Sequence, residues 1–117
     1  ACIKERGAVM NWTMLNEFVS GMIDVLGDAV EEIVLYGSVA KGTNTEESDI
    51  DIALLIKLPL NKELEEQLSD FVVDMNLKYD TVFSVIDIDY QNFKKWESTL
   101  PFYRNVKQEG IVLWKAA

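Results

Sequence analysis

The sequence predicts a single α/β domain in which helices flank a small mixed sheet. Short apolar segments of strand length alternate with segments in which apolar residues recur every three or four positions. The 117 residues include no Pro/Gly/Ser-rich linker, internal repeat or low-complexity tract, and this length is typical of one domain. The expected order is helix, strand, strand, helix, strand, helix, helix, strand, which favours a mixed sheet.

The first half of the chain predicts one helix and two strands. Apolar residues recur on one face over residues 12–26, and Gly27 follows as a helix stop. Residues 33–36 are wholly apolar and predict a short strand. The segment 39–48 is small and polar, which indicates a loop, and a second strand is expected over residues 49–56.

The second half predicts three helices and two strands. Residues 61–76 form an amphipathic helix with one apolar stripe and a largely acidic opposite face, which is expected to be solvated. A β-branched and aromatic segment at 81–86 predicts the third strand. Two short helices are expected over 91–96 and 101–108, and residues 111–114 predict a final strand.

The N-terminal segment, the lack of long apolar runs and the single cysteine indicate where in the cell the protein is expected. Residues 1–11 are interpreted as an N-terminal extension or a tag remnant, and residues 12–115 as the domain. The first twelve residues have no apolar signal-peptide core, and no apolar run reaches the roughly 18–20 residues that span a bilayer. Because Cys2 is the only cysteine, a disulfide framework is excluded. We therefore expect a cytoplasmic protein with no membrane association.

The charged and polar composition excludes several classes of chemistry. The chain contains no histidine, which rules out catalytic triads of the Ser-His-Asp type and histidine-ligated metals. Its net charge of −9 repels a polyanion, so DNA or RNA binding is disfavoured. A small anion held through a metal ion, or a basic protein partner, is compatible with this charge.

Two aspartates stand one residue apart at the start of the second expected strand. Because strand side chains alternate between faces, Asp49 and Asp51 point the same way while Ile50 and Ile52 pack on the other side. Two carboxylates on one face repel each other unless a cation lies between them. Carboxylate oxygens are the ligands that hard divalent cations prefer, and a pair of such cations can activate an attacking oxygen and stabilise a leaving pyrophosphate.

The turn before the loop suits phosphate binding. Gly37 removes the Cβ that would block a close approach, so that backbone amides can reach a phosphate, and Ser38 adds a hydroxyl donor. If the first two strands pair as a hairpin, this turn and the aspartate pair lie at the same end of the sheet. Lys41 is a candidate phosphate ligand from the loop.

A third carboxylate is sought among three later aspartates. A strand, helix, strand crossover within one sheet is usually parallel, which brings the starts of the second and third strands together. Asp80 would then lie near Asp49 and Asp51, whereas Asp87 and Asp89 would lie at the far end. We choose Asp80, a choice that requires the two strands to be parallel.

Each motif taken alone has a simpler interpretation. A Gly-Ser pair is more often a turn than a phosphate cradle, and single aspartates commonly flank strands. A P-loop is excluded, because Thr43 stands where that motif requires lysine. Only the combined pattern indicates a site.

The combined pattern resembles the signature of the polymerase-beta-like nucleotidyltransferase superfamily. The resemblance rests on an apolar strand followed by Gly37-Ser38, ten further residues and Asp49-Ile50-Asp51-Ile52. The spelling GSVAKGTNTEESDIDIAL and the ending FYRNVKQEGIVLW are most similar to the minimal nucleotidyltransferases, or MNT proteins, over residues 12–115. The resemblance implies the single-domain fold of that superfamily, an α/β core with a mixed sheet.

The resemblance also implies an activity and a partner. Members transfer a nucleoside monophosphate, usually from ATP, to an acceptor hydroxyl with Mg²⁺, and we expect two ions. Many minimal members are antitoxins that adenylylate a tyrosine of a HEPN-domain toxin. A homo-oligomer is compatible with the sequence, which leaves the oligomeric state open.

The family roles map onto particular positions of this chain. Gly37 and Ser38 match the triphosphate-binding positions, and Asp49 and Asp51 match the metal ligands. The third carboxylate maps best onto Asp80, where it would help to activate the acceptor hydroxyl. Many relatives carry arginines where this chain has Val39 and Lys41, which weakens the expected phosphate contacts.

Two other functions are weighed against this one. The chain could act as a binding module that neutralises a HEPN partner by covering it, with little or no catalysis. Nucleotide transfer to RNA is disfavoured by the acidic charge, and an aminoglycoside enzyme would normally carry an added substrate domain. Only the catalytic hypothesis requires the carboxylates.

Overall fold

A four-stranded mixed sheet forms the centre of the molecule, as the sequence predicts. The computed structural model describes residues 11–42 and 49–117. The strands are β1 (Val30–Tyr36), β2 (Ile50–Ile56), β3 (Phe83–Asp89) and β4 (Ile111–Lys115), in the spatial order β3-β2-β1-β4. β1 pairs antiparallel with both β2 and β4, whereas β2 and β3 are parallel. The expected hairpin of the first two strands and the parallel crossover are both confirmed.

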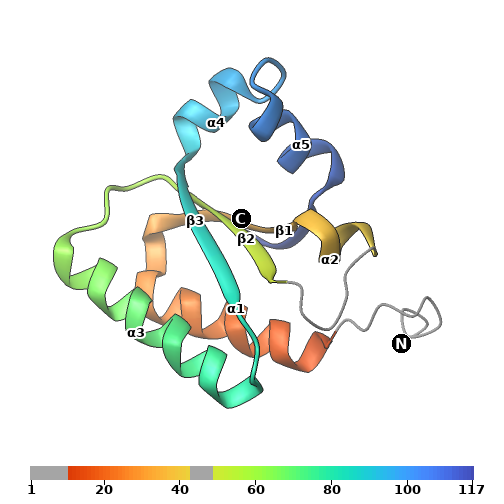
Figure 1. Cartoon of the computed structure of the whole chain (residues 1–117). Helices are drawn as coiled ribbons and strands as arrows, with labels where there is room; N and C mark the ends of the chain where they lie inside the picture. Colours follow the sequence, from red (N-terminus) through yellow and green to blue (C-terminus); the bar gives the residue numbers. More distant parts are fainter. Residues whose placement is uncertain (1–10, 43–48) are drawn as a thin grey trace.

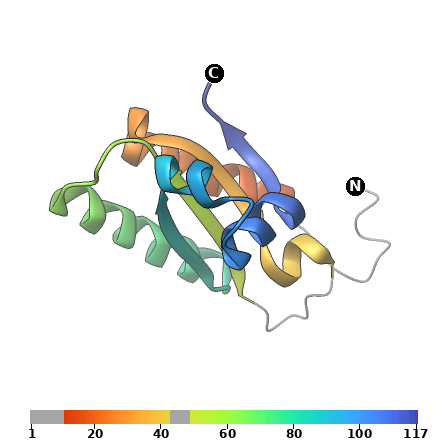
Figure 2. The same ribbon diagram turned by 90° about the horizontal axis from the view of Figure 1, so that it is seen from above.

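Two pairs of helices cover the two faces of the sheet (Figure 1). α1 (Trp12–Leu26) and α3 (Lys62–Tyr79) lie on one face, and α4 (Tyr90–Trp96) and α5 (Pro101–Glu109) lie on the other. A 3₁₀ turn, η2 (Gly27–Ala29), connects α1 to β1, and a short helix α2 (Gly37–Lys41) follows β1. Figure 2 shows α2 beside the start of β2, at the end of the sheet away from the C-terminus. None of the described helices is long and apolar enough to cross a membrane.

The long helices begin and end where local chemistry provides caps. Asn11 Oδ1 accepts a hydrogen bond from the Met14 amide at 3.0 Å, and Asn61 Oδ1 accepts one from the Leu64 amide at 2.8 Å. These side chains satisfy amides that lack partners in the first helical turn. Gly27 ends α1 with φ of 55°, a conformation that favours glycine.

The core has one cluster of buried side chains on each face of the sheet. The larger cluster joins α1 and α3 to alternate residues of the strands, including Ile52 and Leu54, and the smaller one joins α4 and α5 to Ala53 and Leu55. In the larger cluster the fully buried ring of Phe18 stacks on Phe83, with 4.0 Å between ring centroids. The alternation along β2 confirms that Asp51 and its apolar neighbours face opposite sides.

Several boundaries differ from the sequence-based expectation. Residues 37–41 form α2, where a Gly-Ser turn and the first residues of the loop at 39–48 were expected, because Val39 is buried in the larger core cluster and holds this segment against the sheet. The rest of that loop, residues 43–48, lies outside the described residues, as do residues 1–10. β1 begins at Val30, three residues before the expected start. Its pairing with β2 and β4 extends the strand over two glutamates, which interrupt the apolar pattern in the sequence.

Candidate active site

The turn after β1 lies directly against the aspartate of β2. Tyr36, the last residue of β1, is opposite Asp51 in the antiparallel register, and Gly37 follows with φ of 76°. A Cβ on Gly37 would overlap the Oδ2 atom of Asp51. Both the backbone conformation and the contact therefore require glycine, and the expected meeting of Gly37 with Asp51 is confirmed.

The two aspartates at the start of β2 interact electrostatically. Asp51 is half-buried on the face of the sheet that carries α4 and α5, and Asp49 is exposed just before the strand. Burial raises the pKa of Asp51, and the negative charge of Asp49 raises it further. The pKa of Tyr36 is also raised, first by burial and then by the charge of Asp51. A divalent cation at this position would relieve the repulsion between the two carboxylates.

Aromatic side chains form one wall beside these carboxylates. The ring of Phe102 on α5 meets Tyr36 edge-on, with 5.5 Å between ring centroids. Phe102 is 40% exposed, so part of its ring faces solvent next to the site. α5 thus closes one side of the candidate site, and α2 lies on another.

α2 carries the candidate phosphate ligands. Ser38 is its second residue, directly after Gly37. The ammonium group of Lys41 lies 3.3 Å from Glu109 Oε2 at the end of α5, and both side chains are roughly half-exposed. The structure thus pairs the charge of Lys41, at the end of α2, with a carboxylate of α5.

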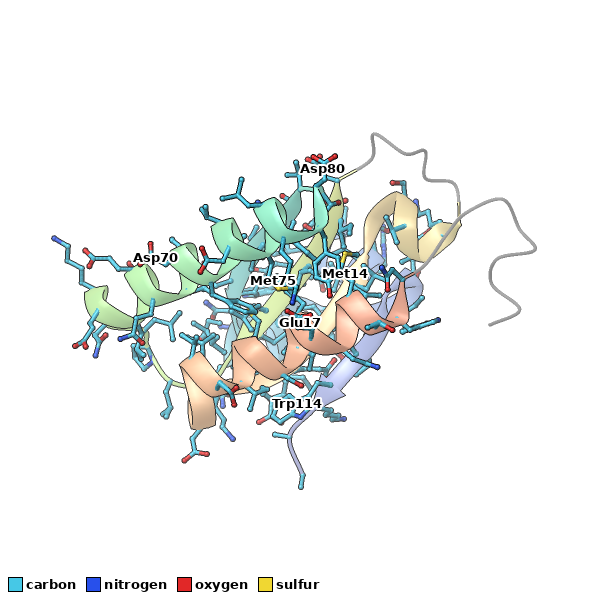
Figure 3. All side chains as sticks on the ribbon, turned by 90° about the horizontal axis from the view of Figure 1, so that it is seen from below. Met14, Glu17, Asp70, Met75, Asp80 and Trp114 are labelled. Carbon is cyan, nitrogen blue, oxygen red and sulfur yellow. The ribbon has the colours of Figure 1, made fainter. Side chains whose placement is uncertain are left out.

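The three candidate third carboxylates occupy different places. Asp80 ends α3 in the left-handed conformation with φ of 48°, three residues before β3 begins. Its carboxylate is exposed at the end of α3 (Figure 3). Asp87 and Asp89 pair in register with Leu54 and Ile56, far along β2 from Asp51, as expected. Asp89 instead caps α4 by accepting a hydrogen bond from the Asn92 amide at 2.9 Å.

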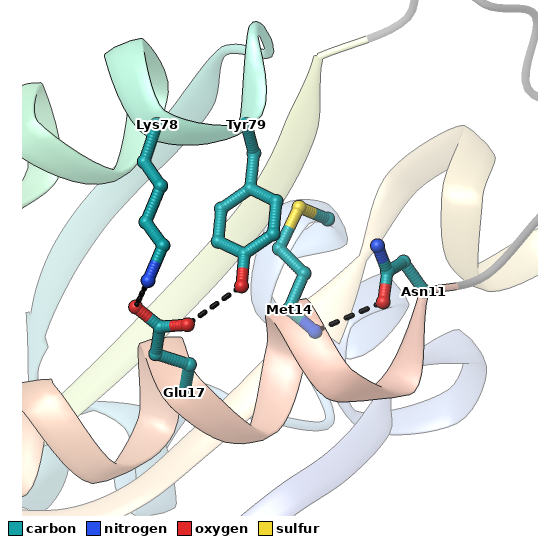
Figure 4. Close-up of polar contacts among 5 residues, drawn as sticks. All are labelled: Asn11, Met14, Glu17, Lys78 and Tyr79. Atoms are coloured by element: carbon teal, nitrogen blue, oxygen red, sulfur yellow. Dashed lines mark hydrogen bonds and ion pairs between the residues drawn. The ribbon is translucent and has the colours of Figure 1, made fainter.

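A polar contact joins α1 to the end of α3 (Figure 4). Glu17 accepts hydrogen bonds from Lys78 Nζ at 2.7 Å and from Tyr79 Oη at 2.6 Å. These bonds, first that of Lys78 and then that of Tyr79, lower the pKa of Glu17. Since Tyr79 immediately precedes Asp80, this contact anchors the turn that leads into β3. No motif in the sequence indicated it.

Comparison with known proteins identifies the family. A model of the nucleotidyltransferase domain family matches residues 15–113. The chain belongs to this family. It is also 33% identical over 100 residues to a proposed protein adenylyltransferase of Methanocaldococcus jannaschii, a match that covers 86% of this chain and 94% of the relative. A second such protein of the same organism is 34% identical over 74 residues, covering 62% of this chain and 74% of the relative.

Solved structures confirm the fold of this nucleotidyltransferase. A toxin–antitoxin structure with AMP-PNP superposes with a TM-score of 0.59 at 19% identity, covering 92% of this chain and 75% of the other. A tri-AMPylated Shewanella oneidensis HEPN toxin in complex with MNT antitoxin gives 0.58 at 18% identity, covering 92% and 74%. A proposed nucleotidyltransferase of Sulfolobus solfataricus gives 0.53 at 20% identity, covering 88% and 78%.

The donors of the nucleotidyltransferase site suit a hard cation. Asp49 and Asp51 offer oxygen ligands, and the missing Cβ of Gly37 leaves room for the carboxylate of Asp51. Such oxygen ligands fit Mg²⁺. Across residues 11–42 and 49–117, no three histidine, cysteine, aspartate or glutamate side chains form a group that could hold a metal ion. The structure therefore does not bring Asp80 into one metal-binding group with Asp49 and Asp51.

Proposed function

We propose that this chain transfers AMP from ATP, with Mg²⁺, to a tyrosine hydroxyl of a HEPN-domain toxin, and so acts as an antitoxin. The observation that supports it best is the contact of Gly37 with Asp51, which places the turn assigned to phosphate directly beside a carboxylate assigned to the cation. The relatives proposed as protein adenylyltransferases supply the reaction class. The structures of toxin–antitoxin complexes, one with a tri-AMPylated HEPN toxin, support a HEPN toxin as the partner and acceptor.

Each site residue has a task in this proposal. Asp49 and Asp51 hold Mg²⁺, which when bound neutralises phosphate charge and polarises the reacting phosphate. The backbone amides at Gly37 and Ser38 donate to the triphosphate, and the missing Cβ of Gly37 leaves room for the Asp51 carboxylate directly beside that turn. Lys41 adds a positive charge once it leaves Glu109, from which it lies 3.3 Å away.

The transfer step forms one bond and breaks another. The tyrosine oxygen bonds to the α-phosphorus of ATP while the bond to the β-phosphate bridging oxygen breaks, and pyrophosphate leaves. The hydroxyl proton passes to a base, for which Asp80 is our candidate because its carboxylate is exposed near the start of β2 and β3. Tyr36 and Phe102, whose rings meet edge-on, flank one side of the site.

The test is calorimetric titration of AMP-PNP with Mg²⁺ into the wild-type chain and the double variant Asp49→Ala/Asp51→Ala. We expect Mg²⁺-dependent binding that the double variant loses. The matched control is Asp70→Ala/Asp74→Ala, which removes two exposed carboxylates from α3 and should bind like wild type. Equal binding by both double variants would overturn the assignment of the site.

The acceptor is tested separately with a purified HEPN-domain protein as the candidate substrate. We expect wild type to add AMP to a tyrosine of that protein, detected by mass spectrometry, and Asp80→Asn to slow transfer while still binding AMP-PNP. If the Asp49→Ala/Asp51→Ala protein neutralises the toxin as well as wild type does, the chain acts by covering its partner and the catalytic proposal is wrong.

A further inference from the structure

The parallel register places a serine directly beside Asp51. Asp51 on β2 is opposite Ser84 on β3, and Tyr36 on β1 is opposite Asp51 on its other side. The three residues therefore form one row across three adjacent strands. Adjacent strands lie about 4.8 Å apart, so position 84 is the nearest backbone position to Asp51 on β3.

The side chains of Asp51 and Ser84 point to the same face of the sheet. The next residues along the two strands, Ile52 and Val85, are also register partners, and both pack into the core cluster on the α1 and α3 side. Because strand side chains alternate, Asp51 and Ser84 face the opposite side. Ser84 is exposed, and β3 is the edge strand of the sheet, so a solvated cation can reach this position.

The negative charge of the side chains around Asp51 determines how many divalent cations the site can neutralise. Two carboxylates, Asp49 and Asp51, balance one divalent cation, whereas a second cation close by needs further negative ligands. The exposed hydroxyl of Ser84 contributes no charge, and the described residues contain no group of three metal-ligating side chains. Asp80 lies on the cap of α3, three residues before β3 begins.

We propose that Ser84 occupies the position beside Asp51 where a third ligand would stand, so that the protein alone binds one divalent cation tightly and a second only weakly. This inference rests on the proposed function, since it assumes that Asp49 and Asp51 bind a metal ion. The second cation is then brought to the site by the phosphates of the nucleotide. The hydroxyl at position 84 sets the number of tightly bound ions.

The experiment counts Mn²⁺ bound to the free protein by electron paramagnetic resonance. Wild type is expected to bind one ion tightly. Ser84→Asp should bind a second ion about tenfold or more tightly than wild type does, because it adds a full charge within about 5 Å of the site. Ser84→Asn has nearly the same size without the charge and should behave like wild type.

A second control tests whether the added charge must stand at position 84 to change metal binding. Ile86→Asp adds the same charge on the same face of β3, two residues further along, at a side chain that is 42% exposed. It should change Mn²⁺ binding by no more than about twofold, because the added charge lies further from Asp51 in a screened, exposed setting. Ser84→Cys offers an independent variant, whose thiolate should tighten Cd²⁺ binding together with Asp51.

The outcomes separate this inference from the proposed function. Ser84→Asp binding no tighter than Ser84→Asn, with Ser84→Cys leaving Cd²⁺ affinity unchanged, would overturn the role of position 84. A loss of the tight ion in Asp80→Asn would also overturn it, since Asp80 would then be the third ligand. If Asp49→Ala/Asp51→Ala retains the tight ion, the proposed site itself is wrong, whatever the Ser84 variants do.

Discussion

Gly37 lies against the carboxylate of Asp51 in a space that no other residue could share. Its backbone has φ of 76°, and a Cβ at this position would overlap Asp51 Oδ2. The turn that we propose binds phosphate and the carboxylate that we propose binds a cation are thus held in direct contact. This contact joins two motifs that are separated by more than ten residues in the sequence.

Gly37→Ala should abolish Mg²⁺-dependent AMP-PNP binding and lower stability. The left-handed backbone costs alanine about 1–2 kcal/mol, and the overlap with Asp51 displaces that carboxylate. The matched control is Gly42→Ala, because Gly42 has the same φ of 76° but no atom within 4 Å of an added Cβ. Thermal unfolding should show a loss in both variants, and calorimetry should show lost binding only in Gly37→Ala. Normal binding by Gly37→Ala would contradict the proposed role of the contact.

Asp51→Asn should stabilise the metal-free protein at neutral pH. Because burial and Asp49 raise the pKa of Asp51, the ionised carboxylate disfavours folding. The stabilising contribution of its protonated form is complete below the ordinary value of 3.8 and is lost as pH rises through the higher folded-state pKa. The variant should therefore have a higher Tm than wild type at pH 7, and this gain should vanish at pH 3. Asp70→Asn on the exposed face of α3 is the control, and an equal gain there would indicate a general charge effect.

Magnesium should reverse the order of the Tm values of wild type and Asp51→Asn. Mg²⁺ should raise the Tm of wild type, since a ligand that binds only the folded state stabilises it by mass action. It should leave the Tm of Asp51→Asn nearly unchanged, because the variant lacks one of the two charged ligands. The same scan with Ca²⁺ and Mn²⁺ would show which cation the site prefers. An equal Mg²⁺ shift in the variant would place the cation elsewhere.

Lys41→Ala should weaken AMP-PNP binding about tenfold if its ammonium leaves Glu109 for a phosphate, as expected for one lost charge-assisted hydrogen bond. Glu109→Gln removes the competing carboxylate, 3.3 Å away, and should tighten binding by up to about fivefold, because exposed ion pairs contribute about 1 kcal/mol or less. Calorimetry with both variants checks this. Wild-type affinity in Lys41→Ala would leave the lysine with the ion pair as its only role.

Glu17→Gln should lower the Tm at neutral pH. The hydrogen bonds from Lys78 and Tyr79 lower the pKa of Glu17, so the stabilisation is present above its ordinary value of 4.5 and is lost as pH falls through the lower folded-state pKa. The Tm difference between the variant and wild type should therefore shrink towards zero in acid. Glu66→Gln, on the exposed surface of α3, serves as the control. A pH-independent difference would mean that packing, not charge, holds α1 to the end of α3.

The local pattern of the chain predicted most of its elements. The apolar stripe of α1 and the stop at Gly27 place that helix at Trp12–Leu26, as observed. Such elements are predictable because helical periodicity and caps depend on residues a few positions apart. The expected parallel pairing of β2 and β3 is also observed, since a crossover through α3 leaves little alternative. The loop at 39–48 was less predictable, because the burial of Val39 that makes α2 depends on distant residues.

By itself, then, the sequence determined most of the elements, the two faces of β2 and the aspartate pair behind the glycine turn, because alternation and spacing are local properties. The tertiary structure alone decided which distant side chains meet. It paired Lys41 with Glu109, anchored the end of α3 through Glu17, and set Ser84 beside Asp51. Strand register is the physical reason for the last of these pairings: a shift of one residue between β2 and β3 would put a different residue beside Asp51, and no spacing within either segment reveals it.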